Sequence, residues 1–251
     1  MAKRDAILQF LDTYLSVGTI GDASQNGLQV QGRETVNKII FGVSASLELF
    51  KRAEASGADM VITHHGLFWD GPVRLTGGMH GRVAQLIKND INFAAYHLPL
   101  DLHPVVGNNV RLLQLLGARD IKPFGSYHNT VIGFKGELKK PMALKDIAVV
   151  FGKKCGAECR TADFGPAKIK TIGAVSGGAG YMVNDAIKQG LDLFVTGETS
   201  EPAWEWCRES GISFMALGHY NSEKEGVIAL AALLAKKFRV RTEFIDIPNS
   251  F

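Results

Sequence analysis

Apolar, strand-like runs alternate with amphipathic helical stretches along most of this chain. Residues 38–44 and 170–176 are apolar runs with the length of a buried strand, and each is followed by a helical stretch, 46–56 or 180–189. Both helical stretches stop at a glycine, which commonly follows the C-terminal end of a helix. This alternation predicts parallel strands covered by helices.

The same order of elements continues in both halves of the chain. The further matched segments are strands at 58–63 and 191–196, helices at about 82–88 and 203–209, strands at 91–97 and 212–217, and helices at 109–116 and 225–237. A final strand is expected to close each half. Matched segments in the same order, offset by about 120 to 130 positions, indicate an internal duplication.

We therefore predict an α/β fold with two similar lobes, built from duplicated β-α-β units with mixed or parallel sheets covered by helices. The lobes are expected at 1–125 and 126–251, with approximate twofold symmetry. Residues 126–166 between the repeats contain scattered Gly, Lys and Pro, and are expected to form loops with short strands and one helix. The alternative is that any two β-α-β segments look alike, but the polar residues that end the strands match as well.

Those polar strand ends carry the candidate chemistry, since ligands bind beyond the carboxyl ends of parallel strands. They are His64 and His65, Glu198, His97 followed by Asp101, and His219 followed by Glu223. The His97/Asp101 pair of one half is echoed by His219/Glu223 in the other. The sequence thus predicts a polar cluster in the cleft between the halves.

Imidazoles and carboxylates together are ligands for Zn, Mn, Fe, Co or Ni. Neighbouring histidines in an extended segment point to opposite sides, so His64 and His65 can each hold one of two nearby ions. A carboxylate such as Glu223 or Asp101 can bridge two ions at about 3.5–4 Å. Each residue alone has a plainer explanation, a hydrogen-bonded structural histidine or an i, i+4 pair on a helix. Their joint occurrence favours a two-metal site.

Composition narrows the function classes. The chain has 251 residues, 46% hydrophobic and 21% charged, which is typical of a globular protein. A net charge of only +3 argues against a nucleic-acid partner. Three cysteines give no disulfide framework and favour a reducing compartment. The longest apolar stretch, near 227–235, is shorter than a membrane span, and acidic residues interrupt the N-terminal apolar helix. We expect a soluble, cytoplasmic protein.

Other residues leave alternatives open. The segment 176–180 (Ser-Gly-Gly-Ala-Gly) follows a strand and fits either an anion-binding loop or a tight turn that needs glycine; it lacks the spacing of a P-loop or a dinucleotide fingerprint. Phe68 and Trp69 fit stacking on a substrate or, preferably, packing against a helix. Trp204, Trp206 and Cys207 are expected in the core. Loop or surface roles are expected for the remaining histidines, His80, His103 and His128. The alternative for His103, which is near Asp101 in the chain, is to orient a ligand or to handle a proton.

Several short motifs run through nearly the whole chain in order. They are Asn26–Val30, Thr63–Trp69, His97–Asp101, Gly107–Asn109, Ser176–Gly178, Val195–Glu198, Gly218–Glu223 and Phe244–Asn249. In this order they resemble the Nif-three-like (YbgI) family, whose members are known as GTP cyclohydrolase I type 2 homologues. The large domain that longer members insert in mid-chain is absent.

The resemblance implies a Nif-three-like fold and a dinuclear site with the ligands His64, His65, Asp101, His219 and Glu223. It also implies a homohexameric ring, and a small-molecule substrate that is phosphorylated or a nucleotide. His97 is a ligand or supports one, and Glu198 is a base, a partner of a ligand, or structural.

Our first hypothesis is a metal-dependent hydrolase in which Glu223, Glu198 and His97 are the catalytic residues. The alternative is a non-catalytic metal-binding scaffold or regulatory partner that forms a ring. Threading of a nucleic acid through such a ring is a third possibility, against which the modest charge argues.

Overall fold

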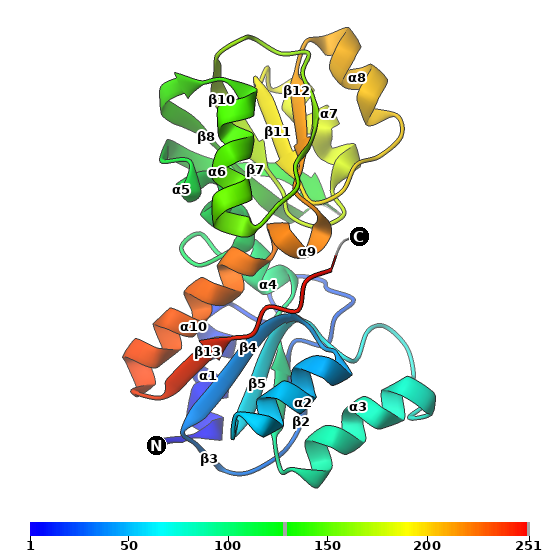
Figure 1. Ribbon diagram of the computed structural model, residues 1–251, viewed down its shortest axis with the longest axis vertical. Helices are drawn as coiled ribbons and strands as arrows, with labels where there is room; N and C mark the ends of the chain where they lie inside the picture. The colour runs from blue at the N-terminus through cyan, green and yellow to red at the C-terminus, as the bar shows by residue number, and fades with distance from the viewer. Residues whose placement is uncertain (128–129, 250–251) are drawn as a thin grey trace. The chain divides into compact units, whose positions relative to one another are not determined.

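The computed structural model describes residues 1–127 and 130–249 (Figure 1). The chain divides into two compact units, Met1–Leu100 with Val227–Pro248, and Asp101–Gly226 with Asn249. This division differs from the expected boundary near residue 125, since the C-terminal segment returns to the first unit.

The first unit contains a five-stranded sheet in the order β13-β4-β5-β6-β2. Strands β13, β4, β5 and β6 are parallel, and β2 runs antiparallel at the edge. The strands are β2 (Gly27–Val30), β4 (Lys38–Ser44), β5 (Met60–His65), β6 (Asn92–Ala95) and β13 (Arg241–Phe244). A separate two-stranded ribbon pairs β1 (Ala2–Lys3) with β3 (Thr35–Val36).

Helices surround this sheet. They are α1 (Arg4–Tyr14), α2 (Leu47–Ala55), α3 (Gly77–Lys88) and the part of α10 (Lys224–Phe238) from Val227 onward. The Ser46 hydroxyl caps α2 by accepting a hydrogen bond from the Leu49 amide. Apolar residues of α2 and α3, such as Phe50 and Leu86, pack with Ile40 and Val61 of the sheet. The short helix α4 (Leu98–Asp101) follows β6.

The second unit contains a six-stranded sheet in the order β7-β8-β10-β11-β12-β9. Its three central strands are parallel, and the others are antiparallel to their neighbours. The strands are β7 (Ala118–Tyr127), β8 (Thr130–Met142), β9 (Arg160–Ala162), β10 (Ile169–Ala174), β11 (Leu193–Thr196) and β12 (Ser213–Ala216). The expected loops within 126–166 are therefore wrong for β8, whose Gly and Lys residues disguised a long strand.

Helices cover both faces of this second sheet (Figure 1). They are α5 (Asn108–Leu115), α6 (Leu144–Cys155), the 3-10 turn η1 (Gly180–Met182), α7 (Val183–Lys188) and α8 (Ala203–Ser210), while the short helix α9 (His219–Ser222) follows β12. Residues of α5 and α6 pack on the face that carries Leu193 and Val195, and residues of α7 and α8 pack on the face that carries Phe194. The layers of the α/β fold are thus helix, sheet and helix.

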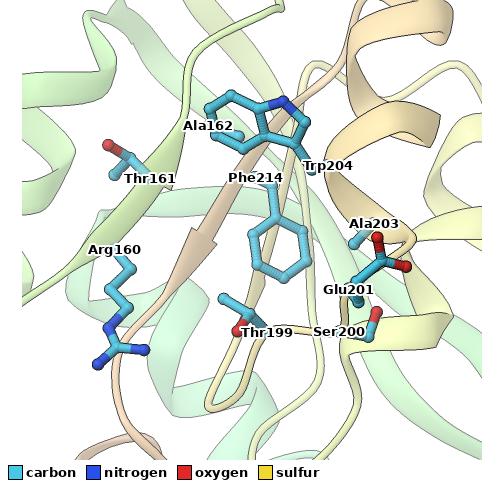
Figure 2. Close-up of a pocket in the computed structure, with 9 residues that line it drawn as sticks. All are labelled: Arg160, Thr161, Ala162, Thr199, Ser200, Glu201, Ala203, Trp204 and Phe214. Carbon is cyan, nitrogen blue, oxygen red and sulfur yellow. The ribbon is translucent and has the colours of Figure 1, made fainter.

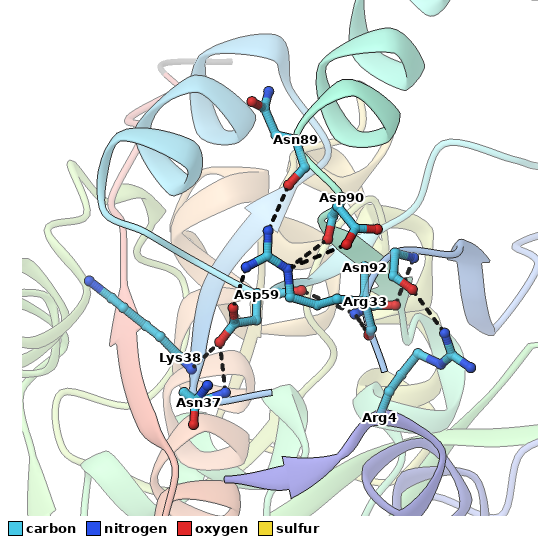
Figure 3. A network of polar contacts seen from close by, with 9 residues as sticks. Arg4, Arg33, Asn37, Lys38, Asp59, Asn89, Asp90 and Asn92 are labelled. Carbon is cyan, nitrogen blue, oxygen red and sulfur yellow. Dashed lines mark hydrogen bonds and ion pairs between the residues drawn. The ribbon is translucent and has the colours of Figure 1, made fainter. Parts of the chain in front are cut away.

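The duplication extends to polar contacts at the starts of the strands. Asp59 accepts hydrogen bonds from the amides of Asn37 and Lys38, within the network drawn in Figure 3. In the second unit Asp192 accepts from the amides of Lys170 and Thr171 in the same way. A chance similarity between two β-α-β segments does not explain carboxylates that bind the same backbone positions.

The last helix and strand of each half do not stay with that half. The strand after α5 is β7, which pairs with β8 in the second sheet. The last strand, β13, pairs with β4 in the first sheet. The expectation that a final strand closes its own half is therefore wrong, because apolar periodicity shows that an element is buried and not which sheet buries it.

The three cysteines are free thiols. Burial raises the pKa of Cys155 to about 12 and that of Cys207 to about 11. Within the described part of the chain, none of the helices has the length and apolar character needed to cross a membrane.

Candidate metal centre

Three histidines gather at the carboxyl ends of two neighbouring strands in the first unit. His64 and His65 end β5, and His97 follows β6. One ring nitrogen from each lies within 4.8 Å of the others, a spacing that suits a metal ion. His64 is fully buried, and its ring centre lies 4.7 Å from that of His65 and 5.0 Å from that of His97. The structure thus brings these three predicted residues together.

Each of the three rings is oriented through its Nδ1 atom. His64 Nδ1 lies 3.0 Å from the backbone oxygen of Tyr96, and His65 Nδ1 lies 3.2 Å from the Ser44 hydroxyl. His97 Nδ1 lies 2.8 Å from Asp22 Oδ1. A partner at Nδ1 fixes the ring and leaves Nε2 as the atom through which a metal would be held.

Asp22 is a site residue that the sequence analysis missed. Burial by itself would raise the pKa of its carboxyl, but hydrogen bonds with His97 and Asn26, together with the Ser24 amide, lower the pKa to about 2. The Leu98 amide also donates to it. A single Asp in a polar loop carries no periodic signal, and only its place shortly before the Asn26–Val30 motif hinted at a role.

A second set of candidate ligands lies in the second unit. His219 is the first residue of α9, and its Nε2 atom lies 3.2 Å from Glu223 Oε1. Its Nδ1 atom lies 2.5 Å from Glu198 Oε1. The hydrogen bond with Glu223, opposed by burial and aided by the charges of Glu223 and Glu198, raises the pKa of His219 to about 9. The imidazole is therefore surrounded by groups that favour a positive charge.

Asp101 is buried, at 6% exposure, at the end of α4. Its Oδ1 atom accepts hydrogen bonds from Asn108 Nδ2 at 2.8 Å and from the Ser176 hydroxyl at 3.1 Å. Asn108 is itself held, because its Oδ1 atom accepts from the Gly226 amide. The carboxylate that the sequence singled out is thus fixed in direction.

With this geometry in view, the comparisons with known proteins decide the family. The family model described as Duf34/NIF3 (NGG1p interacting factor 3) matches residues 2–250. The chain belongs to the Duf34/NIF3 family.

Relatives and solved structures agree with this assignment to the Duf34/NIF3 family. A "GTP cyclohydrolase 1 type 2 homolog" of Pyrococcus horikoshii is 43% identical over 98% of both chains, and one of Pseudomonas aeruginosa is 42% identical over 97% of this chain and 96% of that protein. The solved protein ybgI, described as of unknown function, is 38% identical with a TM-score of 0.91 over 100% of both chains. The predicted Nif-three-like resemblance and fold are confirmed.

Two glycines of this Duf34/NIF3 chain lie in close contact with their surroundings, and one of them, Gly177, makes room for the second ligand set. Gly177 has φ +65°, and a Cβ atom there would lie 2.6 Å from Glu223 Oε1 and 3.3 Å from His219 Nε2. A Cβ atom on Gly180 would lie 2.8 Å from the Ser200 amide nitrogen. Close packing therefore accounts for Gly177 and Gly180, whereas a Cβ atom on Gly178 would meet nothing closer than 3.5 Å.

The strand registers assign Glu198 its counterpart in the repeat. Thr63 and Thr196 occupy equivalent positions, because each pairs with an alanine at the end of the next strand. Two residues further on, Glu198 therefore corresponds to His65. The Glu198 carboxylate is hydrogen-bonded to His219, so that it orients this ring.

The expected echo between His97/Asp101 and His219/Glu223 is shifted by one residue. The amides of Tyr96 and Leu217 donate to equivalent threonine oxygens at the ends of β5 and β11. His97 therefore corresponds to Gly218, and His219 lies one position beyond. The inserted Gly218 has φ +84°, a backbone conformation that glycine adopts without strain.

The aromatic residues depart from expectation in two places. The Trp69 ring lies 5.0 Å from the His97 ring and 6.1 Å from the His65 ring, so that it packs on the histidines, a contact that the sequence did not predict. Trp204 is 51% exposed, and its predicted place in the core is wrong because it lies at the start of α8 beside a pocket. Cys207 is fully buried, as predicted.

The remaining histidines are not among the proposed ligands. His103 accepts hydrogen bonds from the Val105 and Val106 amides, which fixes the turn before α5. His80 is exposed on α3. His128 lies outside the described residues.

Proposed function

We propose that this protein binds two divalent metal ions and uses them in a hydrolytic reaction. The proposed ligands are His64, His65, Asp101, His219 and Glu223. The observation that carries the proposal is the group of three histidines whose ring nitrogens lie within 4.8 Å at the ends of β5 and β6. Histidines gathered this closely, each oriented through Nδ1, are typical of metal sites.

The donor chemistry supports the proposal. The first set offers imidazole nitrogens, and the second combines an imidazole with carboxylates, a mixture that suits Zn, Mn, Fe, Co or Ni. The carboxylates on both sides of His219 favour a positive charge near Nε2, whether that charge is a proton or a metal ion. The residues present thus fit a transition-metal site.

We propose that both sets serve one dinuclear centre. Asp101 connects them along the chain, since it follows His97 by four residues. Its carboxylate is hydrogen-bonded to Ser176, the neighbour of the glycine that packs against Glu223 and His219. These connections support a common site and are the reason for testing ligands of both sets together.

The two ions, when bound, would polarise the group to be cleaved and make water acidic enough to react near neutral pH. Glu198 would hold the His219 ring and, being half exposed, could exchange a proton with solvent. His97, with Nδ1 held by Asp22, would present Nε2 for a ligand bond or a proton transfer. Glu223 would complete the ligand set as a buried carboxylate.

The relatives' names suggest the substrate to try first. We propose a small phosphorylated or nucleotide substrate, with hydrolytic ring opening of GTP as the first candidate. We also propose a homohexameric ring and a cytoplasmic location. Size-exclusion chromatography with light scattering tests the ring, because a monomer or dimer would contradict it.

The test of the hydrolase proposal is turnover. Purified protein loaded with Zn²⁺ or Mn²⁺ is incubated with GTP and with a panel of phosphate esters and cyclic amides. His65→Ala and Glu223→Gln should reduce any turnover at least a hundredfold, whereas the exposed His80→Ala should leave it unchanged. Metal binding without any turnover above that of the two variants would contradict the hydrolase and favour a metal-binding scaffold.

A further inference from the structure

The second unit has a pocket of about 340 Å³ beside the edge strand β9 (Figure 2). Two aromatic residues form part of its wall, the buried Phe214 of β12 and the half-exposed Trp204 of α8. Arg160 and Glu201 lie on opposite sides of the Phe214 ring in the view of Figure 2. A cation, a carboxylate and two aromatic rings thus surround one small cavity.

The pocket lies at the same end of the second sheet as the Glu198–His219 pair. Arg160 is paired with Ala216, the last residue of β12. Thr199, which also lines the pocket, follows Glu198 directly in the chain. A ligand in the pocket would therefore lie next to the loop that carries Glu198.

The charged groups of the pocket are available to a ligand. Within residues 1–127 and 130–249, neither Arg160 nor Glu201 has an ion pair or a side-chain hydrogen bond. By contrast, Arg208 and Glu205, on the nearby helix α8, pair with each other. The pocket thus keeps a separated positive and negative group on either side of an aromatic wall.

We propose that this pocket binds a planar heteroaromatic ring that carries N–H donors and an anionic arm. Trp204 and Phe214 provide aromatic surfaces for stacking or edge contacts with the ring. Glu201 accepts hydrogen bonds from ring N–H groups, since a carboxylate is only an acceptor. Arg160 pairs with a phosphate or carboxylate on the arm. The volume is at the lower end of small-molecule sites, which favours one ring system with a short arm.

That this ligand is the substrate of the metal centre rests on the proposed function. In that case the pocket holds the ring and its arm, and the bond to be cleaved lies on the side of Glu198. Binding itself does not depend on metal, so that the pocket and the hydrolase can fail separately.

The binding test uses metal-free protein and guanosine 5′-monophosphate, with intrinsic tryptophan fluorescence or calorimetry as the readout. Guanosine lacks the anionic arm, ribose 5-phosphate lacks the ring, and inosine 5′-monophosphate lacks the exocyclic amine. We expect each of these three compounds to bind at least tenfold more weakly than guanosine 5′-monophosphate.

Variants assign the contacts. Arg160→Ala should weaken the binding of guanosine 5′-monophosphate at least tenfold and leave the binding of guanosine unchanged. Glu201→Gln should abolish the preference for guanosine 5′-monophosphate over inosine 5′-monophosphate. Trp204→Ala should weaken the binding of both nucleotides. The controls Arg208→Ala and Trp206→Phe lie on the same helix outside the pocket lining and should have no effect.

The proposal is overturned if guanosine 5′-monophosphate does not bind at millimolar concentration, or if the three pocket variants bind it as the wild type does. Intact binding by metal-free protein, without turnover when metal is added, would retain the pocket and reject the hydrolase. Turnover that survives Arg160→Ala and Trp204→Ala with unchanged KM would reject the pocket as the substrate site.

Discussion

Two histidine rings of this protein each have a carboxylate on the nitrogen that faces away from the candidate metal position. Asp22 holds His97 Nδ1, and Glu198 holds His219 Nδ1. A carboxylate in this place fixes both the tautomer and the direction of the ring. Neither partner is a predicted ligand, yet the pairing orients both histidines as a metal site would require.

Replacing Asp22 tests that pairing. Asp22→Asn removes a negative charge and half of the acceptor capacity that meets His97, Asn26 and the Leu98 amide. Loss of such a partner typically lowers metal affinity about 10- to 100-fold. Calorimetric titration with Zn²⁺ at a temperature where both proteins are folded measures the change. The exposed Asp70→Asn is the control, and equal affinity of Asp22→Asn and wild type would refute the role given to Asp22.

Gly177 offers a steric test of the second ligand set. In Gly177→Ala the new Cβ atom would lie 2.6 Å from Glu223 Oε1, so that the carboxylate must move. Gly190→Ala has a similar positive φ but nothing within 4 Å of the new atom. Both variants should lose about 1 kcal/mol of stability through backbone strain, whereas only Gly177→Ala should also lose metal. Thermal unfolding and metal analysis of the pair provide the measurement, and metal content at the wild-type level in Gly177→Ala would contradict the packing argument.

At the scale of elements, the sequence located the central strands well. Residues 38–44 and 60–65 are apolar runs that end in polar residues, a pattern typical of buried parallel strands. β8 was missed because its exposed positions carry Glu and Lys and two of its buried positions are glycines, so that its apolar residues form no continuous run. The pairing of β13 with β4 could not be predicted from the sequence either, because pairing between distant segments depends on the folded chain.

The candidate site was also predictable from the sequence only in part. The five proposed ligands stand out in the sequence because they follow strands, whereas Asp22 lies in a loop whose partners are distant in the chain. The one-residue shift between His97 and His219 depends on Gly218, and only the hydrogen-bond register reveals it. Sequence therefore predicts which chemistry is present better than how each ring is held.

The repeated carboxylates Asp59 and Asp192 give a prediction for the two sheets. Each accepts two backbone amide hydrogen bonds at the amino ends of parallel strands, and Asp59 also pairs with Arg33. Asp59→Ala should destabilise the protein by about 2–4 kcal/mol, because two amides lose a charged acceptor and the Arg33 pair is broken. Asp192→Ala should destabilise the protein less, since Asp192 has no arginine partner in the described residues. Urea unfolding of both variants measures this, and an equal or reversed order would contradict it.

For the whole molecule, the central consequence of the duplication is that each unit carries its own set of candidate ligands. The first unit provides a compact group of imidazoles, and the second provides carboxylates around a single imidazole. Neither repeat reproduces the other's ligand set, although their strands match in register. Divergence of the strand ends within a duplicated fold thus supplies two complementary sets of donors.

The most direct test of this account is the metal content of variants taken from each unit. His65→Ala changes the first set, His219→Ala changes the second, and His80→Ala, on the exposed face of α3, is the control. Mass spectrometry of protein loaded with Zn²⁺ or Mn²⁺ and then desalted gives the number of ions per chain. We predict two ions for wild type and control, and fewer than one for either ligand variant. A variant of either unit that keeps both ions would contradict a shared dinuclear centre.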